Sequence, residues 1–221
     1  MKQGLIAFVM VGMVTSISFA QDGDSAYVPA QPKPSTSGGS TYGELKAGYG
    51  VTQFQSGLKE RFDSGNFGTS GGGLFSVAAY RTFESLGNLH LGLKYKTLGA
   101  AASKGDNNQE MFFNFHSVGV SAKYFPFSAA AVDGLFVQGD YNFVTQFTQK
   151  YRNSAALEFD HQFAIGSSFT LALGYQHSLS HRYGLVASIE YDIASRQGEV
   201  QGVGDKQFRN SNIAVQVGLI F

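Results

Sequence analysis

Apolar and polar residues alternate with a period of two along most of the chain between Tyr42 and Phe221. The clearest example is residues 88–100, whose two faces are Leu89, Leu91, Leu93 and Tyr95 on one side and His90, Gly92, Lys94 and Lys96 on the other. Successive side chains of a β-strand point to opposite sides of the sheet, so this period predicts strands with one apolar and one polar face. The chain is therefore expected to be all-β.

Turn-like segments divide this region into eight predicted strands, at 42–54, 71–83, 88–100, 110–125, 134–148, 169–179, 183–196 and 211–221. Short turns, such as those at 84–87 and 180–182, alternate with longer polar connections. The longer connections are 55–69, 101–109, 149–168 and 197–210. Large apolar residues occur on both faces of the second strand, so the sequence does not decide which of its faces points outward.

Charged residues of both signs fall on the polar faces of separate predicted strands. They are Glu44, Lys46, Lys94, Lys96, Lys123, Asp140, Glu190 and Asp192. In a closed barrel these side chains can pair across the lumen and satisfy one another where water is scarce. In an exported soluble β-sandwich or jelly roll they would be scattered surface charges. The alternation by itself permits both arrangements.

The first 41 residues have a different character. Lys2 precedes an apolar run at 5–14, and Ser18 and Ala20 supply the small residues that cleavage requires, which predicts a signal peptide over 1–20. Residues 21–41 carry Pro, Ser, Thr and Gly and are predicted to be a disordered periplasmic linker. No later apolar run reaches the ~18 residues of a spanning helix. Export then leaves the periplasm, secretion or a barrel over 42–221.

Composition excludes several functional classes. The chain has no Cys, so disulfides, thiolate metal sites and thiol nucleophiles are excluded. Its formal net charge is +0 and no basic cluster stands out, so nucleic-acid binding through phosphate neutralisation is not expected. The mean hydropathy of -0.08 decides nothing, because a barrel whose strands are half polar averages to such a value.

The last predicted strand ends in an aromatic residue, Phe221. Together with the signal peptide, the aromatic residues near strand ends and the alternation of short turns with long loops, it favours an antiparallel up-and-down transmembrane β-barrel of eight strands. The segment 149–168 also alternates in part. A ninth strand there would put the two termini at opposite ends, so this segment is predicted to be a loop with strand-like extension.

Four segments within 42–221 resemble the OmpA/OmpX-like outer-membrane β-barrel superfamily: G-Y-G at 48–50, S-V-G-V-S-A-K-Y-F-P-F at 117–127, L-A-L-G-Y at 171–175 and V-G-L-I-F at 217–221. The resemblance implies a barrel in the outer membrane of a Gram-negative cell, in contact with outer-membrane lipid. It also implies that Phe221 is a membrane-insertion signal for the barrel-insertion machinery. Members of this superfamily differ widely in role, so no activity follows from the fold.

Some barrels of this size modify lipid A with a His, a Ser and an acidic residue on the wall. The candidates here are His116 with Ser117, His161 with Asp160, and His177 with Ser178. Adjacent strand residues face opposite sides, so neither His and Ser pair can act from one face. The deacylase pattern also needs Ser two positions after the His, where Leu179 follows His177. No catalytic residue, metal ligand or cofactor is therefore predicted.

The sequence predicts a non-enzymatic integral outer-membrane barrel with a structural or surface-interaction role. Its long extracellular loops would contact any external ligand. Two alternatives stay open: a narrow, porin-like or gated conductance through the lumen, and a lipid A-modifying enzyme.

Overall fold

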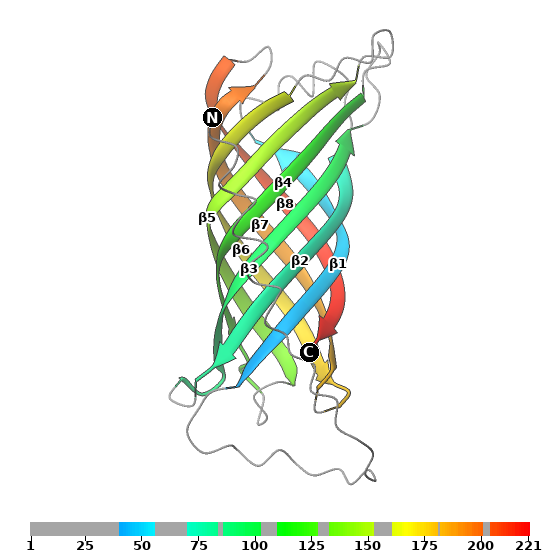
Figure 1. Ribbon diagram of the computed structural model, residues 1–221, viewed down its shortest axis with the longest axis vertical. Helices are drawn as coiled ribbons and strands as arrows, with labels where there is room; N and C mark the ends of the chain where they lie inside the picture. The colour runs from blue at the N-terminus through cyan, green and yellow to red at the C-terminus, as the bar shows by residue number, and fades with distance from the viewer. Residues whose placement is uncertain are drawn as a thin grey trace, which may run out of the picture. The chain divides into compact units, whose positions relative to one another are not determined.

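The computed structural model describes residues 40–55, 70–83, 86–102, 110–127, 133–152, 161–180, 182–200 and 204–221. These residues form a closed barrel of eight antiparallel strands, in which each strand pairs with its neighbours in the chain and β1 pairs with β8 (Figure 1). The strands are β1 (Thr41–Phe54), β2 (Ser70–Thr82), β3 (Leu89–Ala102), β4 (Glu110–Tyr124), β5 (Gly134–Arg152), β6 (His161–Ser178), β7 (Gly184–Val200) and β8 (Gly204–Ile220). The predicted all-β barrel is confirmed. The predicted signal peptide lies outside the described residues, as does the predicted linker up to residue 39.

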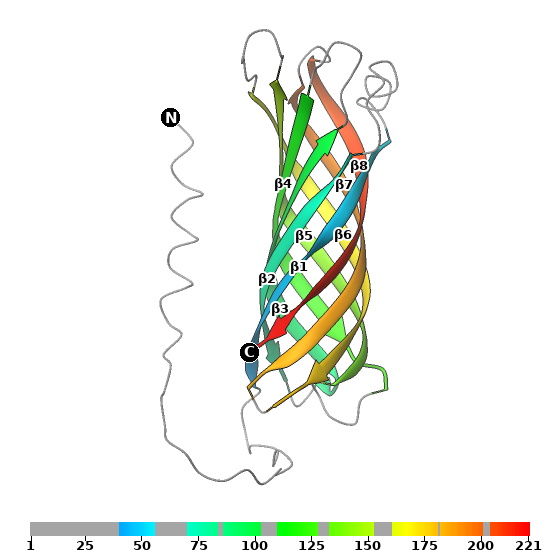
Figure 2. The same ribbon diagram turned by 90° about the vertical axis from the view of Figure 1, so that its right-hand side faces the viewer.

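The strands are strongly staggered around the barrel. Following paired residues once around from Glu44 leads back to β1 at Phe54, ten residues farther along, through Ala78, Lys94, Gly119, Asn142, Ser168, Ala194 and Asn210. A stagger of this kind accompanies strands tilted by roughly 35–45° from the barrel axis. The tilt is visible in Figure 2, where β1 and β8 run side by side. The interior of such a barrel is just wide enough for side chains to fill.

The barrel has a terminal end, where β1 begins and β8 ends, and a loop end opposite to it. Toward the loop end, β5 pairs with β6 as far as Lys150 and His161, and β7 pairs with β8 as far as Val200 and Gly204. The strand-like extension predicted for 149–168 is confirmed, because 149–152 belong to β5 and 161–168 belong to β6. The loop predicted over 197–210 is wrong in extent, since most of its residues belong to β7 and β8. Polar residues such as Gln197 and Gln207 occupy the outward positions at the ends of β7 and β8, so no apolar period marks them.

The inner and outer faces of β2 are resolved by the structure. Leu74 and Tyr80 are buried inside the barrel, whereas Phe75 and Val77 are exposed on the outer wall. Both faces carry large apolar residues because Leu74 and Tyr80 fill the lumen while Phe75 and Val77 cover the outside.

A β-bulge in β5 changes which residues face the lumen. Val118 of β4 pairs with Val144, and the next residue, Gly119, pairs with Asn142, so Phe143 is the extra residue. Phe143 and Val144 are both exposed on the outer wall, and Thr145 is buried inside. Bulges commonly re-aim a side chain in this way. The alternation of the sequence did not reveal this shift.

Glycines on the inner face permit the close approach of neighbouring strands. A Cβ at Gly48 would overlap the carbonyl oxygen of Val215, and a Cβ at Gly166 would overlap that of Ser195. Outward-facing Gly73 differs, because no atom lies within 4 Å of the place where its Cβ would be. Gly48 and Gly166 are therefore required for the close approach of their strands, whereas Gly73 is not.

Apolar and aromatic side chains cover the outside of the wall in a band that we call the apolar belt. Among its exposed members are Leu93, Val120, Leu173, Ile189 and Val217. Within the part of the chain that the structure describes, no helix is long and apolar enough to cross a membrane.

The terminal end of the lumen is filled by an apolar plug. Phe125, Phe136, Val186 and Ile220 are buried together there, and Tyr42 packs against them. The polar residues of the lumen begin directly above this plug.

Candidate functional site: the lumenal ion network

The eight charged residues singled out in the sequence all lie inside the barrel, and none is more than 6% exposed. They reach the lumen because they occupy alternate positions of β1, β3, β4, β5 and β7, on the face opposite to the apolar belt. We call this set the ion network. Its members come from strands far apart in the chain, so the closed barrel is what brings them together.

Glu190 of β7 is the centre of the ion network. Its Oε1 atom lies 2.7 Å from Lys94 Nζ and 3.2 Å from Lys46 Nζ, and its Oε2 atom lies 3.6 Å from Lys96 Nζ. These lysines belong to β1 and β3, so the carboxylate joins separate strands of the barrel. Removing it would leave buried ammonium groups without this partner.

The other carboxylates complete the pairing of the lysines. Lys94 Nζ lies 2.9 Å from Asp140 Oδ2, Lys46 Nζ lies 3.1 Å from Glu44 Oε1, and Lys96 Nζ lies 3.4 Å from Asp192 Oδ1. The ion pairs therefore form one connected series through the lumen. Buried charges are stable only when they are paired and hydrogen-bonded in this manner.

Neutral side chains satisfy the remaining oxygen atoms of the two aspartates. Ser121 Oγ and Gln138 Nε2 donate to Asp140 Oδ1 over 2.6 and 2.7 Å. Thr170 Oγ1 donates to Asp192 Oδ1 over 2.6 Å, and Asn212 Nδ2 donates to Asp192 Oδ2 over 3.2 Å. These donors hold both carboxylates in fixed orientations.

Lys123 joins the ion network to the plug. Its ammonium group pairs with Glu44 Oε2 and lies 4.5 Å from the ring centres of both Tyr80 and Phe136. Aromatic faces attract a cation electrostatically, and more strongly when water is excluded. The terminal end of the lumen is therefore closed by aromatic rings packed around a paired lysine.

Sequence reasoning missed one lumenal cation, Arg196 of β7. It is 1% exposed, and its guanidinium group donates to Thr145 Oγ1 and Asn210 Oδ1 and lies 5.1 Å from the ring centre of Phe115. Thr145 is available for this contact because of the bulge in β5. Arg196 shares the parity of Glu190 and Asp192 along β7, and that signal could have identified it.

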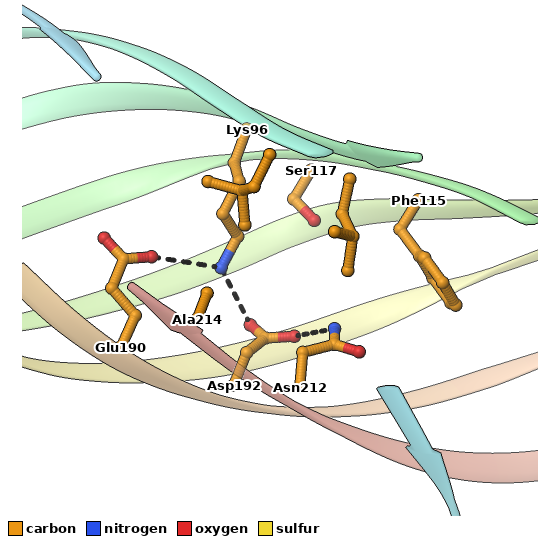
Figure 3. A pocket seen from close by; sticks show the side chains of 9 residues that line it. Lys96, Phe115, Ser117, Glu190, Asp192, Asn212 and Ala214 are labelled. Carbon is orange, nitrogen blue, oxygen red and sulfur yellow. Dashed lines mark hydrogen bonds and ion pairs between the residues drawn. The ribbon is translucent and has the colours of Figure 1, made fainter. Parts of the chain in front are cut away.

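A small cavity lies beside the ion network (Figure 3). Lys96, Glu190, Asp192 and Asn212 supply its polar side, and Leu74, Leu98, Phe115, Ser117 and Ala214 supply the rest of its lining. The positions that the centre of a water molecule can occupy in this cavity span about 10 Å³, so the cavity has room for roughly one water molecule. The described side chains therefore fill the lumen around the network almost completely.

Comparison with known structures identifies the architecture. Neisserial surface protein A is 14% identical, with a TM-score of 0.50 over 82% of this chain and 98% of that chain. The attachment invasion locus protein Ail of Yersinia pestis, solved with the heparin analogue sucrose octasulfate, is 10% identical, with a TM-score of 0.49 over 82% and 99%. OprG of Pseudomonas aeruginosa is 12% identical, with a TM-score of 0.43 over 83% and 97%. This chain has the fold of the small eight-stranded outer-membrane β-barrels. No family model and no curated protein sequence matches it.

The last residue of the barrel, Phe221, closes the seam between β1 and β8. The backbone N–H of Gly43 donates to the Phe221 carbonyl over 2.6 Å, and the Phe221 N–H donates to the Gly43 carbonyl over 3.0 Å. A Cβ at Gly43 would meet the ring of Phe221, so the glycine leaves room for the terminal aromatic side chain.

The histidines considered in the sequence lie apart from one another. His116 is half-buried on the outer wall, where its Nδ1 atom lies 3.0 Å from the hydroxyl of Tyr95, whereas Ser117 is buried inside. His177 is exposed at the terminal end, with Nδ1 3.4 Å from Asp133 Oδ1. Asp160 and the His161 side chain lie outside what the structure describes.

Among the described residues, no group of three or more His, Cys, Asp or Glu side chains is arranged to hold a metal ion.

Proposed function

We propose that this barrel is a non-enzymatic outer-membrane protein with a structural or surface-interaction role that is carried by its loop end. The filled lumen is the observation that supports this proposal. A solute passing through would have to displace the plug and separate the buried ion pairs centred on Glu190. Breaking a buried pair is costly, so the resting barrel offers no low-energy path.

The loop end supports an external role. The hairpins β5–β6 and β7–β8 stay paired toward the loop end, and the outward residues of β7 and β8 there are polar, including Ser195, Gln197, Gln207 and Arg209. Gln207 Nε2 donates to Ser195 Oγ over 2.9 Å, which ties β8 to β7 in this region. Two paired hairpins of this kind provide rigid supports for the connecting loops, which are the surfaces that we propose to contact an external ligand.

A complementation experiment separates the structural role from the interaction role. Cells lacking the protein receive either the wild type or a variant in which residues 153–160 are replaced by Asn-Gly, and their sensitivity to detergent is measured. A structural role predicts that both proteins restore resistance. An interaction role predicts that both proteins insert, as judged by heat-modifiable gel mobility, but that only the wild type restores resistance to detergent. Failure of both to change any phenotype would contradict the proposal.

A conducting lumen is the main alternative, because Lys94 and its carboxylate partners could move apart. The proposal predicts that purified wild-type protein gives no discrete conductance steps in a planar bilayer. Steps that change in the Lys94→Ala variant would overturn the proposal in favour of a pore.

The enzyme alternative is tested in cells. Expression of the protein is expected to leave the acylation of lipid A unchanged when lipid A is analysed by mass spectrometry. A change that disappears in the His116→Ala variant would overturn the assignment as non-enzymatic.

A further inference from the structure

The outer wall carries a polar patch where β3, β4 and β5 leave the apolar belt. Thr97 of β3 is paired with His116 of β4, which is paired in turn with Gln146 of β5. In the next row toward the loop end, Gly99 is paired with Asn114. These side chains face outward and are half-buried, except for Gly99, which is exposed. On β7 and β8, the outward residues Tyr191, Ile193 and Ile213 are aromatic or apolar instead.

A Tyr and His pair holds the centre of the patch. The Tyr95 hydroxyl lies 3.0 Å from His116 Nδ1, and the two rings are nearly parallel at 14° with centres 6.3 Å apart. When the hydroxyl donates to Nδ1 of the neutral imidazole, the proton of the ring is on Nε2. An N–H donor is then presented at the outer wall, at the border of the lipid-facing surface.

The surface beside these groups is open. Gly73 of β2 is paired with Gly99, and no atom lies within 4 Å of a Cβ at Gly73. At Gly99 the first atom that a Cβ would meet is Asn114 Oδ1 at 3.4 Å. The surface next to the polar side chains is therefore backbone that no side chain covers. Below the patch, Val118 is exposed and continues the wall into the apolar belt.

We infer that this patch binds one glycolipid of the outer leaflet. A sugar ring lies on the bare backbone of Gly73 and Gly99, and its hydroxyl and amide groups hydrogen-bond to the patch side chains. The acyl chains run down past Tyr95 and Val118. The described side chains of the patch are hydroxyl, amide and imidazole groups without a cation, so they suit a sugar better than a phosphate, which is recognised by Arg and Lys.

A lipid is the occupant that this position supports. The patch is continuous with the lipid-contacting belt and faces the leaflet on the loop side, where the extracellular loops of such barrels lie. Polar side chains at the edge of the hydrocarbon need hydrogen-bond partners, and the headgroup region of an outer-leaflet lipid supplies them.

The test is native mass spectrometry of the full barrel released from nanodiscs that contain either lipid A, a diglucosamine glycolipid, or phosphatidylglycerol. The wild type is expected to retain one lipid A. The double variant His116→Phe, Asn114→Leu should lower its occupancy by about tenfold or more, because hydrogen bonds are lost without loss of apolar surface. Tyr191→Phe is the matched control on the far wall and should retain lipid A as the wild type does. His116→Gln keeps a donor and should restore part of the occupancy.

Three results would overturn the inference. One is equal retention of lipid A by the double variant and the Tyr191→Phe control, when both show heat-modifiable mobility and are therefore folded. Another is equal retention of phosphatidylglycerol, which would indicate unselective lipid contact. The third is a dimer without lipid, which would assign the patch to a second copy of the chain.

Discussion

Glu190 and Ile189 are neighbours in β7 and have opposite environments. Glu190 is 2% exposed and is surrounded by three lysines, whereas Ile189 is 59% exposed on the outer wall. The same contrast runs along the five strands that carry the ion network, β1, β3, β4, β5 and β7. The inner face of these strands depends on specific partners across the lumen, and the outer face depends only on the solvent that surrounds it.

This difference predicts at which positions a substitution destabilises the barrel. Each lumenal charge is stabilised by particular atoms on other strands, so its loss leaves buried groups unpaired. If lipid covers the apolar belt, an outer apolar side chain is surrounded by chains that are as apolar as itself, and a smaller apolar residue should cost little. Substitutions at adjacent positions should therefore differ strongly in effect.

The largest expected effect is that of Glu190→Ala. Three lysines lose a carboxylate partner, and the free energy of unfolding should fall by about 3–5 kcal/mol. Ile189→Ala, one residue away, should cost about 1 kcal/mol or less. The measurement is urea unfolding of the barrel in lipid vesicles, with gel mobility as the readout of the folded fraction. Equal losses for the two variants would contradict the contrast between the faces.

The outer face becomes sensitive when a charge is added. Ile189→Arg places a cation in the apolar belt and should cost about 2–4 kcal/mol near the middle of the bilayer. Gln197→Arg adds the same side chain to the same strand and the same face, beyond the belt, and should leave stability nearly unchanged. If both variants unfold at the same urea concentration, lipid does not cover Ile189.

Glycines on the two faces should respond differently to a methyl group. Gly48→Ala brings a Cβ against the Val215 carbonyl at the seam between β1 and β8, and should cost about 1–3 kcal/mol through overpacking. Gly73→Ala meets open space and should change stability by no more than about 0.5 kcal/mol. The measurement for both variants is the temperature at which the gel mobility changes from that of the folded to that of the unfolded barrel. A Gly48→Ala variant as stable as the wild type would show that the seam can relax.

A small effect on stability is expected for Phe221→Ala. The two backbone hydrogen bonds to Gly43 remain, and the lost ring lies on the outer wall, so the folded barrel should be destabilised by about 1 kcal/mol or less. If Phe221 is the insertion signal, the yield of inserted barrel in cells should nevertheless fall. Tyr175→Ala removes another outer aromatic residue and should keep the yield. Equal yields would reject the signal role.

Much of the wall could be predicted from the sequence. The period of two assigned Glu44, Lys94 and Glu190 to the inner face, because side-chain direction in a strand depends only on parity. The same parity extends to Arg196, which was missed because the predicted strand ended at that residue. The ends of β7 and β8 were missed because their outward residues beyond the apolar belt are polar, so no apolar face marks them.

The amino-acid sequence alone was enough to assign an all-β fold and the two faces of most strands, since both follow from local alternation. The tertiary structure alone decided the partners. The stagger of the strands puts Glu190 beside Lys46 and Lys94, the bulge turns Thr145 toward Arg196, and the register sets Tyr95 beside His116. Register and stagger are properties of the closed sheet, and no single strand encodes them.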